Sequence, residues 1–237
     1  MLSQYIKNLS IPLVAFTLMG IYPHLSEAQT FRQAKDKLSR SVYADHKISF
    51  YCGCDYELQR KPNGKGKRLT PDWQSCGFKP RKQAERASRI EWEHVMPVHH
   101  FGQHMQCWRN GGRKACKNDP LFSKLAGDMH NLVPAIGEVN GNRSNFKFGM
   151  IAGENRLYGQ CDAEVDFKAR RFEPKESVRG DIARTYFYMA YTYKVRLSKQ
   201  QIQLFKSWSK MDPVDRWERL KNQRIEKLQG NLNPYIQ

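Results

Sequence analysis

Three short segments of this chain carry residues that could do acid–base and metal chemistry. Glu91-Trp-Glu-His94 places two carboxylates beside an imidazole, His130-Asn-Leu-Val-Pro-Ala135 comes later, and Gly137-Glu-Val-Asn-Gly-Asn-Arg-Ser-Asn145 follows it almost at once. Histidine titrates near neutral pH and suits a general base. Glutamate and asparagine supply the hard oxygen ligands that magnesium or calcium takes. Together these groups suit hydrolysis of a phosphodiester, which needs a base for water, a cation on the phosphate oxygens and a group that holds the phosphate.

The elements that must position these residues follow from the hydrophobic pattern. Residues 90–95 alternate apolar and polar side chains as a strand does, and 131–135 predict a second short strand. Residues 137–145 predict a short polar helix. A strand, a returning strand and a helix would bring His94 and its neighbouring carboxylate opposite Asn140.

The rest of the chain is predicted to be mainly helical. A short strand is expected at 48–52, and the turn formers of 61–68 predict a basic loop. Helices are expected at 31–44, 81–88, 97–101, 120–129, 177–195, 198–210 and 213–229. The aromatic residues of the helix at 177–195 favour core packing over a base-stacking surface. The predicted fold class is α+β, a mostly helical single domain around a small antiparallel sheet.

Three stretches of sequence resemble the bacterial endonuclease I family. They are Arg89-Ile-Glu-Trp-Glu-His-Val-Met-Pro97, His130-Asn-Leu-Val-Pro-Ala-Ile-Gly-Glu-Val-Asn-Gly-Asn-Arg-Ser-Asn145 and Tyr158-Gly-Gln-Cys161. The resemblance covers nearly the whole chain after its N-terminal leader. It implies a periplasmic or secreted nuclease with a ββα-metal (His-Me finger) site. It also implies cleavage of double- and single-stranded DNA with little sequence preference, with RNA left open as a further substrate.

The resemblance assigns a role to four residues. His94 matches the general base that activates water, and Glu93 and Asn140 match the ligands of a single divalent metal ion. The metal expected from these ligands is Mg²⁺, with Ca²⁺ or Mn²⁺ as alternatives. Arg113, in Gly111-Gly-Arg-Lys114, matches the arginine that contacts the phosphate.

Three polar residues of the same motifs leave a choice between a structural and a functional role. A structural role is favoured for Asn131, which could tie the two strands together so that His94 is oriented. Glu138 and Arg143 share the predicted helix of Asn140, and each could support the site from behind or lie exposed at the surface. For Arg143 a phosphate contact also stays open.

The cysteines indicate disulfide bonds. The chain has six of them: Cys52, Cys54, Cys76, Cys107, Cys116 and Cys161. An even number in an exported chain favours disulfides, and six cysteines allow 15 connectivities. A local bridge between Cys107 and Cys116 would close a flexible loop, and the other pairings stay open. Zinc ligation is disfavoured: Cys52-x-Cys54 is too closely spaced, and His99, His100 and His104 lack a second set of ligands.

The N-terminus predicts export. The apolar run 11–21 has the length of a signal-peptide core, and Ser26-Glu27-Ala28 offers a cleavage site before Gln29. No later stretch approaches the roughly 20 apolar residues that cross a bilayer. We therefore expect a signal peptide at 1–28, a single domain at 29–237, a periplasmic or secreted location, no membrane contact and a monomer.

The charge of the chain predicts a polyanionic partner. The formal net charge is +17, and each phosphate neutralised by lysine or arginine releases condensed counterions. The basic segments 61–68 and 79–86 are candidate contacts for a nucleic-acid backbone. Charge alone also fits an exported module that captures DNA or an acidic glycan without cutting it. A nuclease with a catalytic zinc is a second alternative.

Overall fold

The computed structural model describes residues 29–61, 63–153 and 155–237, so the expected signal peptide lies outside the described residues. The helices are α1 (Phe31–Lys37), α2 (Ala84–Ala87), α3 (Val98–Gly102), α4 (Gln106–Arg109), α5 (Gly112–Ala115), α6 (Pro120–Ala126), α7 (Gly137–Arg143), α8 (Arg179–Tyr193), α9 (Lys199–Met211) and α10 (Arg216–Gln229). The strands are β1 (Tyr56–Arg60), β2 (Lys67–Pro71), β3 (Ile90–His94), β4 (Leu132–Ile136), β5 (Lys147–Phe148), β6 (Ala163–Asp166) and β7 (Arg171–Pro174).

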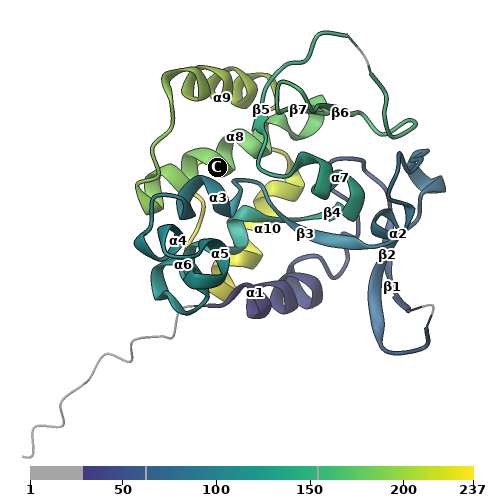
Figure 1. The fold of residues 1–237 in the computed structure, drawn as a ribbon, viewed down its shortest axis with the longest axis horizontal. Coiled ribbons are helices and arrows are strands. Elements are labelled where there is room, and N and C mark those ends of the chain that lie inside the picture. The colour runs from purple at the N-terminus through teal and green to yellow at the C-terminus, as the bar shows by residue number, and fades with distance from the viewer. Residues whose placement is uncertain (1–28, 62, 154) are drawn as a thin grey trace, which may run out of the picture.

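The two strands expected around the site form an antiparallel pair at the middle of the molecule (Figure 1). Ile90 lies opposite Ile136, and His94 lies opposite Leu132. Helix α7 begins at Gly137, directly after β4. The predicted order of strand, strand and helix is therefore present.

Hydrophobic clusters cover both faces of this strand pair. On one face the Trp92 ring lies against Tyr43, with ring centroids 5.4 Å apart, in a cluster that also contains Leu38 and Ile225. On the other face, Val139 of α7 belongs to the larger core cluster of the molecule. Figure 1 shows α1 and α7 on opposite sides of β3.

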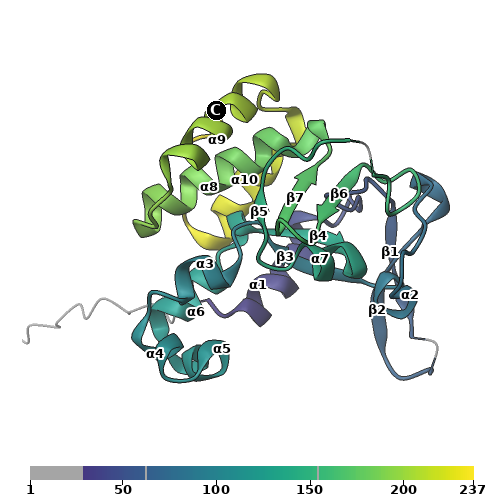
Figure 2. The same cartoon turned by 45° about the horizontal axis from the view of Figure 1, so that its top comes forward.

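Two further small sheets flank the central pair. Strands β1 and β2 form an antiparallel hairpin that projects from the body of the molecule (Figure 2). The other sheet has the order β5-β7-β6, in which β6 pairs with β7 antiparallel and β5 pairs with β7 parallel. The predicted α+β class is confirmed, with the short parallel pair as a detail that the sequence did not indicate.

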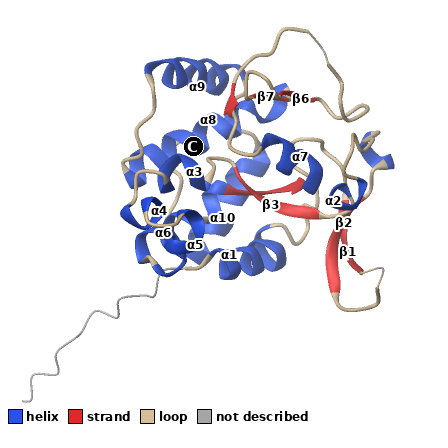
Figure 3. Cartoon of the chain, viewed as in Figure 1, coloured by secondary structure: helices blue, strands red, loops and turns tan. Residues whose placement is uncertain are grey.

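Helices make up most of the secondary structure (Figure 3). The three long helices near the C-terminus begin and end within a few residues of their predicted limits. Ser198 and Asp215 cap the starts of α9 and α10, and Gly230 ends α10 at φ +86°. Tyr186 and Tyr188 of α8 are buried in the core as expected, whereas Tyr191 is 60% exposed. None of the helices among the described residues is long and apolar enough to cross a membrane.

The strand expected at 48–52 is not formed. Only Ile48 makes a bridge, to Asp55, and the chain then turns through Gly53, which has φ +74°. The cysteines on either side of Gly53 pair with different partners, Cys161 and Cys76. Covalent bonds to distant segments therefore decide the path here, against the local preference for an extended strand.

Other boundaries also differ from expectation. The helix expected at 31–44 is α1 continued by a π-helical segment, Leu38–Val42, and the helix expected at 120–129 ends at Ala126. The helix expected at 81–88 begins only at Ala84, because the carboxylate of Glu138 accepts the backbone N–H groups of residues 81, 82 and 83 at 2.7–3.0 Å. In the basic segment 61–68, which was expected to be a loop, Lys67 and Arg68 already belong to β2.

Candidate active site

A pocket of about 570 Å³ runs along the edge of β3. Among the described residues, strand β3 pairs with β4 alone, so side chains from both of its faces reach its other edge. The pocket is lined by the candidate residues Glu93, His94, Arg113 and Asn140 together with Phe31, Lys35, Arg86, Ile90, Glu91, Trp92, Pro97, Val98, Gly141 and Ser144. The tertiary structure thus brings together all four residues to which the resemblance assigned a role.

His94 is buried and held from two sides. Its Nε2 lies 2.8 Å from the carbonyl oxygen of Ala126, and its ring packs on Phe31 with centroids 4.7 Å apart. A carbonyl oxygen can only accept, so Nε2 carries the proton and Nδ1 has the free lone pair. Burial lowers the pKa of His94 to about 4, although the hydrogen bond to Ala126 works against that shift. The ring is therefore neutral at pH 7 and able to take a proton.

Glu93 points to the opposite face of β3 from Trp92 and is also buried. Its Oε1 accepts a hydrogen bond from the Tyr51 hydroxyl at 3.0 Å and pairs with the Arg143 guanidinium at 3.0 Å. Burial raises the pKa of Glu93 to about 7, and the Arg143 charge and the Tyr51 hydrogen bond oppose the shift. A metal cation bound beside Arg143 would further stabilise the charged form of this buried carboxylate.

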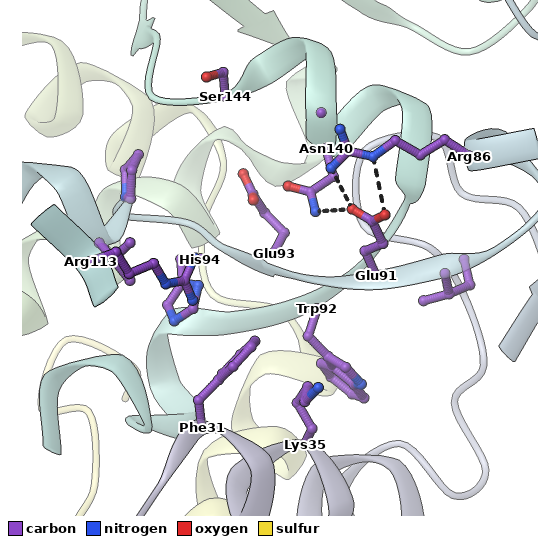
Figure 4. A pocket seen from close by; sticks show the side chains of 14 residues that line it. Phe31, Lys35, Arg86, Glu91, Trp92, Glu93, His94, Arg113, Asn140 and Ser144 are labelled. Atoms are coloured by element: carbon purple, nitrogen blue, oxygen red, sulfur yellow. Dashed lines mark hydrogen bonds and ion pairs between the residues drawn. The ribbon is translucent and has the colours of Figure 1, made fainter. Parts of the chain in front are cut away.

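Asn140 lies on α7, with its amide over the face of β3 from which Glu93 projects. Its Nδ2 donates to Oε2 of Glu91 at 2.8 Å, so its Oδ1 is turned away from Glu91. Figure 4 shows this oxygen facing the carboxylate of Glu93. A carboxylate and an amide oxygen that face each other in a solvent-accessible pocket fit a hard divalent cation with water as its other ligands.

Comparisons with known proteins show the family to which this chain belongs. Residues 30–237 match the endonuclease I family. The chain is 52% identical over 221 residues to an extracellular deoxyribonuclease of Aeromonas hydrophila, which covers 93% of either chain. It is 49% identical over 240 residues to a periplasmic deoxyribonuclease of the same species, which covers 100% of this chain and 98% of the relative. The chain belongs to the endonuclease I family. It is also 44% identical over 208 residues to endonuclease-1 of Buchnera aphidicola, across 88% of this chain and 80% of that one.

Membership of this family confirms the resemblance seen in the sequence and the prediction of a nuclease. The endonuclease I family consists of metal-dependent enzymes, and the facing oxygens of Glu93 and Asn140 fit that requirement.

Arg113 lies on α5 at the rim of the pocket. Its guanidinium stands 5.9 Å from the centroid of the Phe31 ring, so it approaches the site from the side of His94. Burial lowers its pKa, but an arginine keeps its charge at any pH of interest. Lys35 and Arg86 also line the pocket, which therefore presents cations around the candidate ligands.

The three residues with open roles are all completely buried. Arg143 donates to the carbonyl oxygens of His94 and Val95 at 3.1 and 2.6 Å, and its burial keeps it away from a phosphate in the pocket. Asn131 donates to the carbonyl of Met96 and accepts from its N–H, at 2.9 and 2.7 Å, which joins the end of β3 to the start of β4. Glu138 holds the backbone before α2 rather than facing the pocket.

The cysteines form disulfides, and this excludes them as zinc ligands. The predicted local bridge, Cys107–Cys116, is confirmed, and the remaining pairs are Cys52–Cys161 and Cys54–Cys76. No free cysteine occurs among the described residues.

Sequence reasoning missed three residues of the site. Phe31 packs on His94 from the start of α1, far from it in the sequence, and no local pattern indicates that contact. Tyr51 supports Glu93 from a segment that was expected to be a strand. Glu91 could have been found, because it is two residues from Glu93 on the same strand, and such residues share a face.

Proposed function

We propose that this chain is an exported endonuclease that hydrolyses DNA, double- and single-stranded, with one divalent metal ion and a histidine general base. The observation that supports this most is the pocket along β3. It combines a neutral imidazole with a free Nδ1, two facing oxygen ligands and three cations. The relatives are named deoxyribonucleases, one extracellular and one periplasmic. Cleavage of RNA stays a prediction from the sequence.

In this proposal His94 takes a proton from water through Nδ1. The Ala126 carbonyl keeps the ring in the required tautomer and stabilises the imidazolium once it forms. Glu93 and Asn140 hold the metal ion, proposed to be Mg²⁺ with Ca²⁺ or Mn²⁺ as alternatives. When bound, the cation would neutralise charge on the phosphate and stabilise the leaving oxygen.

The remaining residues are proposed to contact the substrate or to keep the strand and segments around the site in place. Arg113 is proposed to contact the scissile phosphate from the rim of the pocket. Arg143 and Asn131 keep the end of β3 in place through their hydrogen bonds to its backbone, and Glu138 fixes the segment before α2. None of these contacts reads a base, which agrees with cleavage at any sequence.

Binding of nucleic acid is proposed to rest on phosphate contacts. The net charge of +17 favours a polyanion. The projecting hairpin β1–β2 carries the basic segment 61–68. We further propose that residues 1–28 are a signal peptide removed near Ala28, that the single domain 29–237 acts as a monomer, and that it makes no membrane contact.

Plasmid cleavage with purified protein tests this function. We expect relaxation and then linearisation of the plasmid, loss of cleavage with EDTA, and recovery on adding Mg²⁺. Binding without cutting would indicate a capture module. Recovery with Zn²⁺ and not with Mg²⁺ would indicate a zinc enzyme.

Single substitutions test the proposed roles. His94→Ala should reduce kcat by roughly 10²–10⁴-fold, the range for loss of a general base, and should leave Mg²⁺ affinity unchanged. Glu93→Ala and Asn140→Ala should instead weaken Mg²⁺ binding, measured by calorimetry. If His94→Ala abolished metal binding while Glu93→Ala preserved it, the role assignment would be wrong even for an active nuclease.

A further inference from the structure

The amide of Asn140 can serve a metal ion only in one of its two orientations. Its oxygen is a ligand for a hard cation, whereas its NH₂ group would repel one. An isolated asparagine turns about its last side-chain bond with little preference between the two. Something in the protein must therefore decide which atom faces Glu93.

The neighbour that contacts this amide is Glu91. Its Oε2 accepts from Asn140 Nδ2 at 2.8 Å and from Arg86 Nη2 at 2.7 Å. Its Oε1 accepts from Arg86 Nε at 3.1 Å and from Arg89 Nε at 3.0 Å. A carboxylate has no proton to donate, so only the nitrogen of the amide can face it. Figure 4 shows the Glu91 carboxylate joined by dashed lines to Asn140 and Arg86.

We propose that Glu91 is a positioning residue that orients the Asn140 amide, so that its Oδ1 faces Glu93 and completes the metal site. This inference rests on the proposed metal ligands and adds a residue to which no role was assigned. Glu91 and Glu93 then have different roles on one face of β3. Glu93 contacts the cation, and Glu91 decides what Asn140 presents to it.

The sequence of α7 makes room for this contact. A Cβ at Gly137 would meet the backbone oxygen of Arg86 and lie 3.1 Å from Oε1 of Glu91. A Cβ at Gly141 would meet the Arg86 guanidinium. The two glycines are one turn apart and flank Asn140, so the Arg86–Glu91 pair can lie directly against the helix. The two arginines in turn fix both carboxylate oxygens, which leaves Glu91 little freedom to turn away from Asn140.

The arginines also predict what Glu91→Gln would do. A glutamine has a single acceptor oxygen. Two arginine N–H groups, from Arg86 and Arg89, point to the Oε1 position, and one, from Arg86, points to the Oε2 position, so the oxygen is drawn to the Oε1 position. Its NH₂ group then faces Asn140, and two donors cannot bond to each other. The Asn140 amide is expected to turn over and present its own NH₂ group to the metal.

Calorimetric titration of the metal-free full-length mature protein with Mg²⁺ tests this directly. We expect Glu91→Gln to weaken Mg²⁺ binding about 10- to 100-fold, the range for partners that orient metal ligands. Glu91→Asp keeps the charge but is too short to reach Asn140, and it should weaken binding to a similar extent. Glu57→Gln removes an exposed carboxylate from β1 and should leave binding unchanged.

A reciprocal variant separates orientation from general damage. In Glu91→Gln/Asn140→Asp the glutamine NH₂ donates to a carboxylate, which keeps its second oxygen for the metal. This double variant should bind Mg²⁺ at least about tenfold more tightly than Glu91→Gln alone. Urea unfolding of each variant shows that the protein is folded during the titration.

The outcomes distinguish this inference from the proposed function. If Asn140→Ala leaves Mg²⁺ affinity unchanged, the metal site is misplaced and both ideas fail. If Asn140→Ala weakens binding but Glu91→Gln and Glu91→Asp do not, only the role of Glu91 is wrong. A loss in Glu91→Gln with full affinity in Glu91→Asp would show that charge alone matters, and would also overturn it.

Discussion

At the scale of single residues, burial shifts the pKa values of Glu93 and His94 in opposite directions. It raises the pKa of Glu93 to about 7 and lowers the pKa of His94 to about 4. Both shifts favour the uncharged form, because each group has been moved out of water. His94 is thereby neutral wherever the enzyme would act. Glu93, in contrast, still holds a proton in part of the population at neutral pH and must lose it when a cation binds.

This predicts that Mg²⁺ affinity depends on pH. Below about pH 7 the cation displaces a proton from Glu93, so affinity should fall about tenfold per pH unit as the pH is lowered. Above pH 7 the carboxylate is already ionised and affinity should level off. Calorimetric Mg²⁺ titrations between about pH 5.5 and 8.5 measure this. Glu93→Gln should bind weakly at every pH, and a wild-type affinity that is flat below pH 7 would contradict the prediction.

At the scale of elements, the start of α1 lies on the end of α6. The Gln29 side chain donates to the carbonyl of Gly127 at 2.9 Å, and Phe31 packs on His94. The carbonyl of Ala126, next to Gly127, accepts from His94. The contact between these two helix ends therefore holds His94 from both sides.

Gly127→Ala should disturb that contact. A Cβ at this position would meet the backbone oxygen of Gln29, and backbone cannot yield as a side-chain end can. We expect a loss of about 1–3 kcal/mol in the free energy of unfolding, the cost of overpacking, together with a lower kcat. Urea unfolding and plasmid cleavage measure the two effects. Lys124→Ala, on the exposed side of α6, is the control and should change neither; equal behaviour of the two variants would refute the prediction.

At the scale of the whole molecule, the disulfides close loops of very different length. Cys107–Cys116 joins residues 9 apart and holds the segment that carries Arg113. Cys52–Cys161 joins residues 109 apart, and so ties the segment before β1 to the segment before β6. In the chain-entropy account a long loop restricts the unfolded chain more than a short one.

Removing the long-range disulfide should therefore cost more stability. Loops of about 15 and 100 residues correspond to about 3 and 4.7 kcal/mol. We expect the Cys52→Ala/Cys161→Ala variant to be less stable than Cys107→Ala/Cys116→Ala by roughly 2 kcal/mol in urea unfolding. Thiol titration of the unfolded, unreduced wild type should find no reactive thiol. Equal stability of the two variants would show that strain or contacts, not loop length, dominate.

Much of the site was predictable because its residues are close together in sequence. Glu93 and His94 end a strand whose alternation is visible in the residues themselves, and Asn140 follows the next strand by a few positions. The strand pair and α7 accordingly form where the pattern predicts. The long C-terminal helices carry their own caps, and the local disulfide Cys107–Cys116 needs only a short loop. Each of these features depends on interactions within a few residues.

Only the tertiary structure decided the features that join distant segments. The segment 48–52, expected to be a strand, leads into a turn whose cysteines bond to Cys76 and Cys161. Phe31 packs on His94. Arg143 is buried behind β3. Glu91 lies against Asn140, 49 residues away. The local pattern indicates on which face of a strand or helix a side chain lies. It does not indicate which residue that side chain contacts, because the contact depends on how elements far apart in the sequence pack together.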